Sequence, residues 1–236
     1  MKFLFLIMIM ITAFGVLVVH AQTYRTKVVV MNDVTDSLIT PVDMEVILDY
    51  INLRKEMWQS VNVSYVEITD MTNNPVRQAK IVSRNSWFSN ELDRKEEING
   101  FETRVRELPT KAKEGHKGLD HSSIYLPLVN QLNALAQSSA KYKVLILQSD
   151  LMENDIVKFY ADSTWSQVEK EPEKVIEQLR ERQTPANYSD ITIYLVFKPA
   201  DRKEDQRYQA VSRLFKQLLQ DAGARVVIQS TLNLKQ

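Results

Sequence analysis

The chain has 236 residues, and its 30 basic and 30 acidic side chains cancel at neutral pH. This balance gives no argument for binding to nucleic acid or to an anionic membrane surface. Cysteine is absent from the sequence, which excludes disulfides, a thiolate nucleophile and thiolate-bound zinc. With only five glycines, the chain also lacks a glycine-rich phosphate-binding loop.

The N-terminus has the layout of an export signal. Met1-Lys2 precedes a predominantly apolar run from Phe3 to Val19, and Val19-His20-Ala21 offers compact residues to a signal peptidase. Cleavage after residue 21 would start the mature chain at Gln22. The run is slightly long for a signal and slightly short for a membrane span, so an uncleaved anchor is the alternative. Either way we expect an exported protein, periplasmic or extracellular, whose only attachment to the membrane would be a retained leader.

Residues 22–236 suit a single domain in which strand patterns and helix patterns alternate. The predicted strands are rich in β-branched and aromatic residues, and they cover 27–32, 61–69, 79–87, 143–147, 191–197 and 225–229. The predicted helices show apolar residues at helical spacing or a charged helical pattern, and they cover 41–57, 91–108, 123–140, 172–182 and 205–222.

This alternation predicts the fold class. Buried β-runs that alternate with amphipathic helices form a mostly parallel sheet with helices on both faces. We therefore expect a three-layer, doubly wound α/β domain, with the weaker strand 79–87 at an edge as part of a hairpin. Trp58, Trp87 and Trp165 are expected to be packing residues, because large aromatic side chains usually fill cores.

Two predicted strands end in acidic residues. Asp33 follows the first strand and is followed at alternate positions by Thr35 and Ser37, while Asp150 follows the strand at 143–147. The carboxyl ends of parallel strands form the ligand-binding edge of open α/β sheets. Oxygen ligands suit a small hard cation such as Mg²⁺, with Mn²⁺ or Ca²⁺ as alternatives. The sequence therefore predicts a metal site at this edge.

These motifs resemble those of the von Willebrand factor type A domain family. Asp33-Val34-Thr35-Asp36-Ser37 resembles the family's Asp-x-Ser-x-Ser motif, and Asp150 resembles its later aspartate, with Leu151 where glycine is usual. The family's threonine before the third main helix has no counterpart, so Ser122 or Ser123 would supply that hydroxyl. The resemblance implies a metal-ion-dependent adhesion site that binds an acidic side chain of a partner protein and catalyses no reaction.

Other interpretations remain open at this point. The hydroxyl and acidic residues could simply cap helices, with Ser122 or Ser123 as an N-cap and Asp150 paired with Glu153 in a variant capping box. A metal-free scaffold of an envelope assembly would explain the departures from the family motif. A Mg²⁺-dependent phosphohydrolase of the haloacid dehalogenase type would need an acid at Thr35. His116 and His121 are expected to be solvated loop residues.

Overall fold

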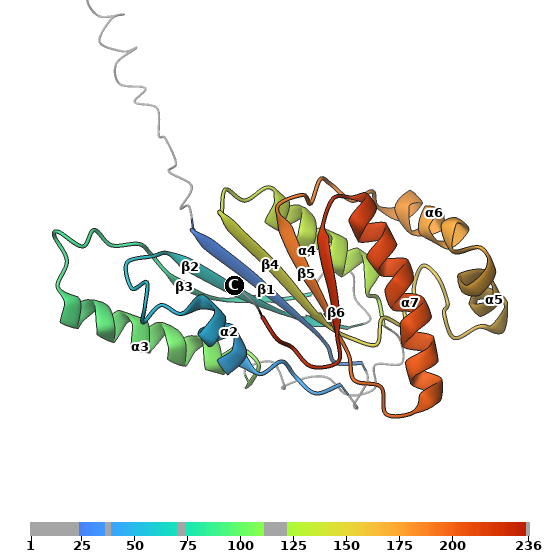
Figure 1. The fold of residues 1–236 in the computed structure, drawn as a ribbon, viewed down its shortest axis with the longest axis horizontal. Coiled ribbons are helices and arrows are strands. Elements are labelled where there is room, and N and C mark those ends of the chain that lie inside the picture. The colour runs from blue at the N-terminus through green and yellow to red at the C-terminus, as the bar shows by residue number, and fades with distance from the viewer. Residues whose placement is uncertain (1–23, 36–38, 70–73, 111–121, 235–236) are drawn as a thin grey trace, which may run out of the picture.

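The computed structural model describes residues 24–35, 39–69, 74–110 and 122–234 (Figure 1). These residues form a six-stranded sheet with the strand order β3-β2-β1-β4-β5-β6. Every neighbouring pair of strands is parallel except β2 and β3, which are antiparallel. The strands are β1 Thr26–Asp33, β2 Val61–Ile68, β3 Val76–Ile81, β4 Tyr142–Gln148, β5 Ile191–Val196 and β6 Arg225–Gln229.

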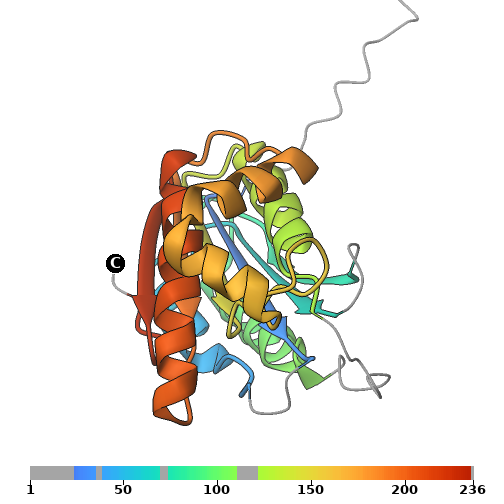
Figure 2. The same cartoon turned by 90° about the vertical axis from the view of Figure 1, so that its right-hand side faces the viewer.

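Helices lie on both faces of this sheet, as Figures 1 and 2 show. The first two helices cover one face, and the later helices cover the other. They are α2 Met44–Ile51, α3 Glu91–Glu107, α4 Tyr125–Ala136, α5 Asp162–Lys170, α6 Pro172–Arg182 and α7 Arg202–Asp221. The predicted three-layer, doubly wound α/β class is therefore confirmed.

The central strand β1 contributes side chains to the hydrophobic cores on both faces of the sheet. Its side chains alternate between the faces, so Val28 and Val30 pack with Ile47 of α2 and Phe101 of α3. Val29 and Met31 pack instead with the helices α4, α6 and α7 on the opposite face. A strand buried on both faces must be apolar almost throughout, which explains the continuous β-branched run in the sequence.

The described structure corrects several of the predicted element bounds. The strand expected at 79–87 covers Val76–Ile81, and the helix expected at 41–57 covers only Met44–Ile51. Asn52 ends α2 early because it adopts a left-handed conformation with φ of 47°. The sequence did not predict α5. Trp87, expected to be a packing residue, is 89% exposed.

The strand ends define two opposite sides of the sheet, because five of the six strands run in the same direction. We call the side on which these strands begin the amino edge and the side on which they end the carboxyl rim. Thr26 pairs with both Val61 and Tyr142, so the starts of β1, β2 and β4 lie side by side at the amino edge. Within the described residues, no helix combines the length and apolar character needed to cross a membrane.

Candidate site at the carboxyl rim

Asp33 is the centre of a buried polar cluster at the carboxyl rim. It is the last residue of β1 and is only 1% exposed. One carboxylate oxygen, Oδ1, accepts hydrogen bonds from the amide of Thr35 at 3.0 Å and from its hydroxyl at 2.6 Å. The other oxygen, Oδ2, accepts a hydrogen bond from the Ser149 hydroxyl at 2.8 Å. The carboxylate therefore joins the loops that follow β1 and β4.

Ser122 brings a third loop into this cluster. Its hydroxyl is in hydrogen-bond contact with the hydroxyl of Thr35, although the two residues are 87 positions apart in the sequence. The neighbouring Ser123 points elsewhere, because its hydroxyl bonds to Asp155 at 3.2 Å and its amide bonds to the Thr69 carbonyl at 3.1 Å. Of the two serines that the sequence could not separate, the structure places Ser122 in contact with Thr35.

Asp150 lies in the loop after β4 and forms a tight local turn. Its Oδ1 accepts a hydrogen bond from the Met152 amide at 2.9 Å, and it helps line a cavity of about 120 Å³ beside Tyr208. Burial, with the nearby Asp150 carboxylate, raises the pKa of Tyr208. Leu151 has a φ of +64°, the left-handed region that favours glycine. The amide of Leu151 donates a hydrogen bond to Ser149 Oγ at 2.9 Å, which holds this turn in place.

Glu153 caps the start of α4, a role for which Ser122 and Ser123 were the candidates in the sequence. Its Oε2 accepts hydrogen bonds from the amides of Ile124 at 2.8 Å and Tyr125 at 2.7 Å, at the start of α4. Its Oε1 accepts hydrogen bonds from the amides of Asp155 and Ile156. Glu153 is fully buried, and this burial raises the pKa of its carboxyl against the opposing effect of the four amides.

The capping interpretations of the sequence were therefore wrong in detail. The N-cap position of α4 is Ile124, which makes no side-chain capping bond, so neither Ser122 nor Ser123 caps this helix. Asp150 and Glu153 do not form a capping box, since Glu153 bonds to amides at the start of α4 and in its own loop. No signal in a single sequence identifies a cap that comes from a distant loop.

Ser37, His116 and His121 lie outside the described residues. The predicted ligands that the structure brings together are therefore Asp33, Thr35 and Ser122, and it adds Ser149, which the sequence analysis overlooked. Ser149 directly precedes Asp150 at the end of β4, so the strand-end rule could have identified it.

The oxygens of this cluster fit a small hard cation. One carboxylate and the hydroxyls of Thr35 and Ser122 converge from separate loops, and oxygen donors are the ligands that Mg²⁺ prefers. Within the described ranges, no group of three or more histidine, aspartate or glutamate side chains is arranged to hold a metal ion. The donor set is instead hydroxyl-rich, with a single carboxylate, and would leave much of the positive charge of an ion uncompensated.

Comparisons with known proteins add little to this geometry. No family model matches the chain, and no curated protein matches it. Among solved structures, the SpRpn10 VWA domain aligns with 90% of this chain and 92% of its own length, at 10% sequence identity and a TM-score of 0.33. Likeness at this level carries no argument about family or function, so the assignment of the architecture rests on the strand order and the two covered faces.

Proposed function

We propose that this domain binds a partner protein at the carboxyl rim through a divalent cation, Mg²⁺ foremost, held by Asp33, Thr35 and Ser122. The observation that carries the proposal is the contact between the hydroxyls of Thr35 and Ser122, because the Thr35 hydroxyl also donates a hydrogen bond to the buried Asp33 carboxylate. Ser37 and Asp150 are further ligand candidates by their resemblance to the family motif. Mn²⁺ or Ca²⁺ would suit the same oxygen donors.

The expected role of the ion follows from its ligands. A cation that is held mainly by neutral hydroxyls retains positive charge, and an acidic side chain of a partner can then complete its coordination shell. We propose a binding function and no catalysis. In a phosphohydrolase of the haloacid dehalogenase type, an acid would stand at Thr35, whereas the Thr35 hydroxyl here donates a hydrogen bond to Asp33. We further propose that the protein is exported, as its apolar N-terminal run suggests.

A metal-free scaffold is the second candidate, and one observation favours it. The hydroxyls of Thr35, Ser122 and Ser149 and both oxygens of Asp33 already satisfy one another without an ion. Such a network can hold three loops together by itself, because hydrogen bonds within the protein offset the cost of removing these polar groups from water.

Thermal unfolding of the protein with Mg²⁺, Mn²⁺ or excess chelator separates the two functions. An ion that binds only the folded state must raise the unfolding temperature. We expect a rise with Mg²⁺ that is lost in Ser122→Ala and retained in Ser123→Ala, because only Ser122 contacts Thr35. An unfolding temperature that is the same with each ion and with chelator would support the metal-free scaffold and reject the metal site.

A further inference from the structure

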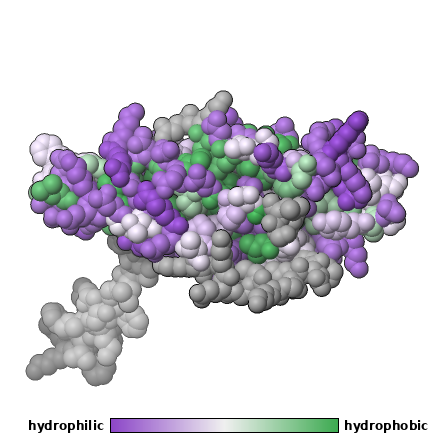
Figure 3. All heavy atoms as spheres, turned by 90° about the horizontal axis from the view of Figure 1, so that it is seen from below, coloured by the Kyte–Doolittle hydropathy of each residue, from purple (hydrophilic) through white to green (hydrophobic). Residues whose placement is uncertain are grey.

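The connection between β3 and α3 exposes two large aromatic side chains. Trp87 is 89% exposed and Phe88 90% exposed, and Leu92 beside them is 69% exposed. Exposed single hydrophobic residues are ordinary on protein surfaces, but adjacent aromatic residues that are almost completely exposed indicate a binding surface. Figure 3 shows hydrophobic side chains at the left tip of the molecule, where this connection lies in Figure 1.

Strand pairing and hydrogen bonds attach the β3–α3 connection to the amino edge. Because β3 is antiparallel, its last residue, Ile81, pairs with Val61 at the start of β2. The fully buried Arg94 of α3 then donates hydrogen bonds to the carbonyls of Met57 at 2.6 Å and Gln59 at 2.8 Å, just before β2. The aromatic pair is therefore held at the same edge of the sheet at which β1 begins.

Basic side chains without ion-pair partners gather at the same edge. Lys27 of β1 is in register with Asn62 of β2, which is in register with Lys80 of β3, so these residues lie in one row across three strands. Burial is the main cause that lowers the pKa of Lys27, and the neighbouring cations Lys80 and Lys143 lower it further, although Lys143 forms an ion pair with Asp190 at 2.6 Å. Within the described residues, four of these side chains form no ion pair: Lys27, Lys80, Lys141 and Arg225.

A hollow of about 360 Å³ opens among further cations at the start of the strands. Its lining includes Arg25, Lys55, Tyr142 and Arg225, and Glu56 is the only acidic residue among the lining residues. Tyr142 is 42% exposed, with the Arg25 guanidinium 5.7 Å and the Lys141 ammonium 5.2 Å from its ring centre. Such a combination of an aromatic ring, several cations and an open hollow suits a phosphate-bearing headgroup.

The apolar N-terminal run joins the domain at this edge too. Its last residue is Val19, and the four residues His20 to Thr23 separate it from Tyr24, which directly precedes Arg25 and β1. A fully extended chain spans at most ~3.6 Å per residue, so a connection of this length reaches less than ~20 Å. Any bilayer that contains the apolar run must therefore lie close to the amino edge.

We propose that the amino edge of this domain rests on an anionic lipid bilayer, with Trp87 and Phe88 inserted at the headgroup level and the basic residues facing lipid phosphates. Aromatic residues favour the interface between lipid and water, and clustered lysine and arginine residues bind anionic headgroups. The carboxyl rim would then point away from the membrane and remain free for a partner protein. This proposal does not depend on a metal ion at the rim.

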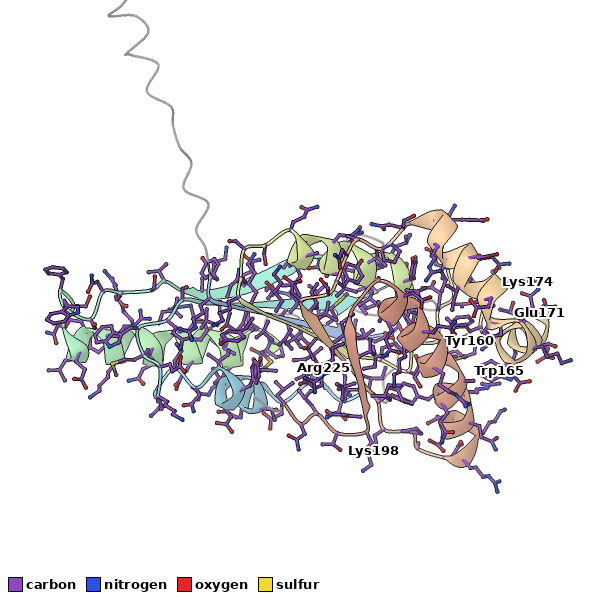
Figure 4. All side chains as sticks on the ribbon, turned by 45° about the horizontal axis from the view of Figure 1, so that its top comes forward. Tyr160, Trp165, Glu171, Lys174, Lys198 and Arg225 are labelled. Carbon is purple, nitrogen blue, oxygen red and sulfur yellow. The ribbon has the colours of Figure 1, made fainter. Side chains whose placement is uncertain are left out.

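The test uses the full chain reconstituted in lipid vesicles whose acyl chains carry bromine, which quenches nearby tryptophan fluorescence. The variant Trp58→Phe/Trp165→Phe retains Trp87 alone, and the matched variant Trp58→Phe/Trp87→Phe retains Trp165 alone. Figure 4 shows Trp165, a residue of α5, at the opposite end of the molecule from the β3–α3 connection. We expect strong quenching of Trp87 in vesicles that contain phosphatidylglycerol and little quenching of Trp165 in the same vesicles.

Two further results decide between lipid and other partners. Lys80→Gln/Lys141→Gln, added to the variant that retains Trp87, should weaken its quenching in anionic vesicles and change little in vesicles of phosphatidylcholine alone. Circular dichroism would confirm that each variant is folded. Trp87 fluorescence that is unquenched in anionic vesicles, or quenched no more than that of Trp165, would overturn the proposal and leave the aromatic pair as a surface for another protein.

Discussion

The carboxyl rim buries charged side chains, whereas the amino edge exposes large aromatic ones. At the carboxyl rim, Asp33 and Glu153 are buried and their carboxylates accept hydrogen bonds from several loops. At the amino edge, Trp87 and Phe88 are exposed to solvent and Lys80 forms no ion pair within the described residues. The buried groups at the rim therefore contribute to the stability of the fold, whereas these groups at the amino edge lie exposed to solvent.

Replacing Glu153 with alanine should cause the largest loss of stability among the variants at the carboxyl rim. The variant leaves four amides without their acceptor inside the protein, so we expect a loss of about 3–5 kcal/mol in the free energy of unfolding. Urea unfolding would measure it. The control is Glu169→Ala, since Glu169 is exposed and accepts one hydrogen bond, from the Trp165 indole; it should cost less than about 0.5 kcal/mol. Similar losses for the two variants would refute the structural role of Glu153.

Asp33→Ala should have the next largest effect, measured in chelator so that no ion contributes. It removes the acceptor of the Thr35 amide and of the hydroxyls of Thr35 and Ser149, and we expect a loss of about 2–3 kcal/mol. Asp43→Ala is the matched control, because Asp43 is an exposed N-cap of α2 whose loss should cost about 1 kcal/mol. Equal losses of unfolding free energy for Asp33→Ala and Asp43→Ala would show that the buried position of Asp33 adds nothing to stability.

The tyrosines offer a pH test of the amino edge. Hydrogen bonding to Lys141 and Arg25 lowers the pKa of Tyr142, whereas burial raises the pKa of Tyr188 to about 12. An absorbance titration should therefore show one of the nine tyrosines ionising first, and Tyr142→Phe should remove that step. The pKa of Tyr142 is lower in the folded chain than in the unfolded chain, where it is about 10. The free energy of unfolding should therefore rise as the pH increases from the folded pKa towards 10. A first step that survives in the variant would contradict the assignment.

The smallest effect on stability is expected from Trp87→Ser/Phe88→Ser. Both side chains are almost fully exposed, so we expect a change within about 0.5 kcal/mol in urea unfolding without lipid. Phe101→Ser is the contrasting variant, because Phe101 is completely buried in α3 and should cost more than about 3 kcal/mol. A large loss for the exposed pair would show that it packs against the domain, which would remove the difference between the two edges.

Much of the fold could be predicted from the sequence because its local patterns are strong. The β-branched run of β1 and the helical spacing in α7 arise from burial, which imposes periodicity on a chain. The prediction was wrong where such periodicity is weak. The edge strand β3 alternates only partly, and α2 ends at Asn52 through a left-handed residue rather than at a glycine or proline. The short, mostly exposed α5 buries only Val168, so it has almost no apolar stripe to detect.

The candidate site could be predicted only in part, because most of its contacts join residues that are far apart in the sequence. Asp33 and Thr35 could be selected because they are two residues apart at the end of one strand, and the structure joins them by a hydrogen bond. Whether Ser122 or Ser123 contacts Thr35 depends on how three loops pack together. The order of two neighbouring serines in the sequence does not reveal this packing. The role of Glu153 was missed for the same reason, since its partners Tyr125 and Ile124, at the start of α4, lie 28 and 29 residues away.

The sequence by itself determined the alternation of strands and helices, the acids at two strand ends and the apolar N-terminal run. These features are local, and a single stretch of chain is enough to encode each of them. Only the tertiary structure showed that a chain with no net charge places cations that form no ion pair within its described residues at the same edge of the sheet as exposed aromatic residues. Net charge sums over all positions, whereas binding depends on which side chains the strand order and register bring to one surface.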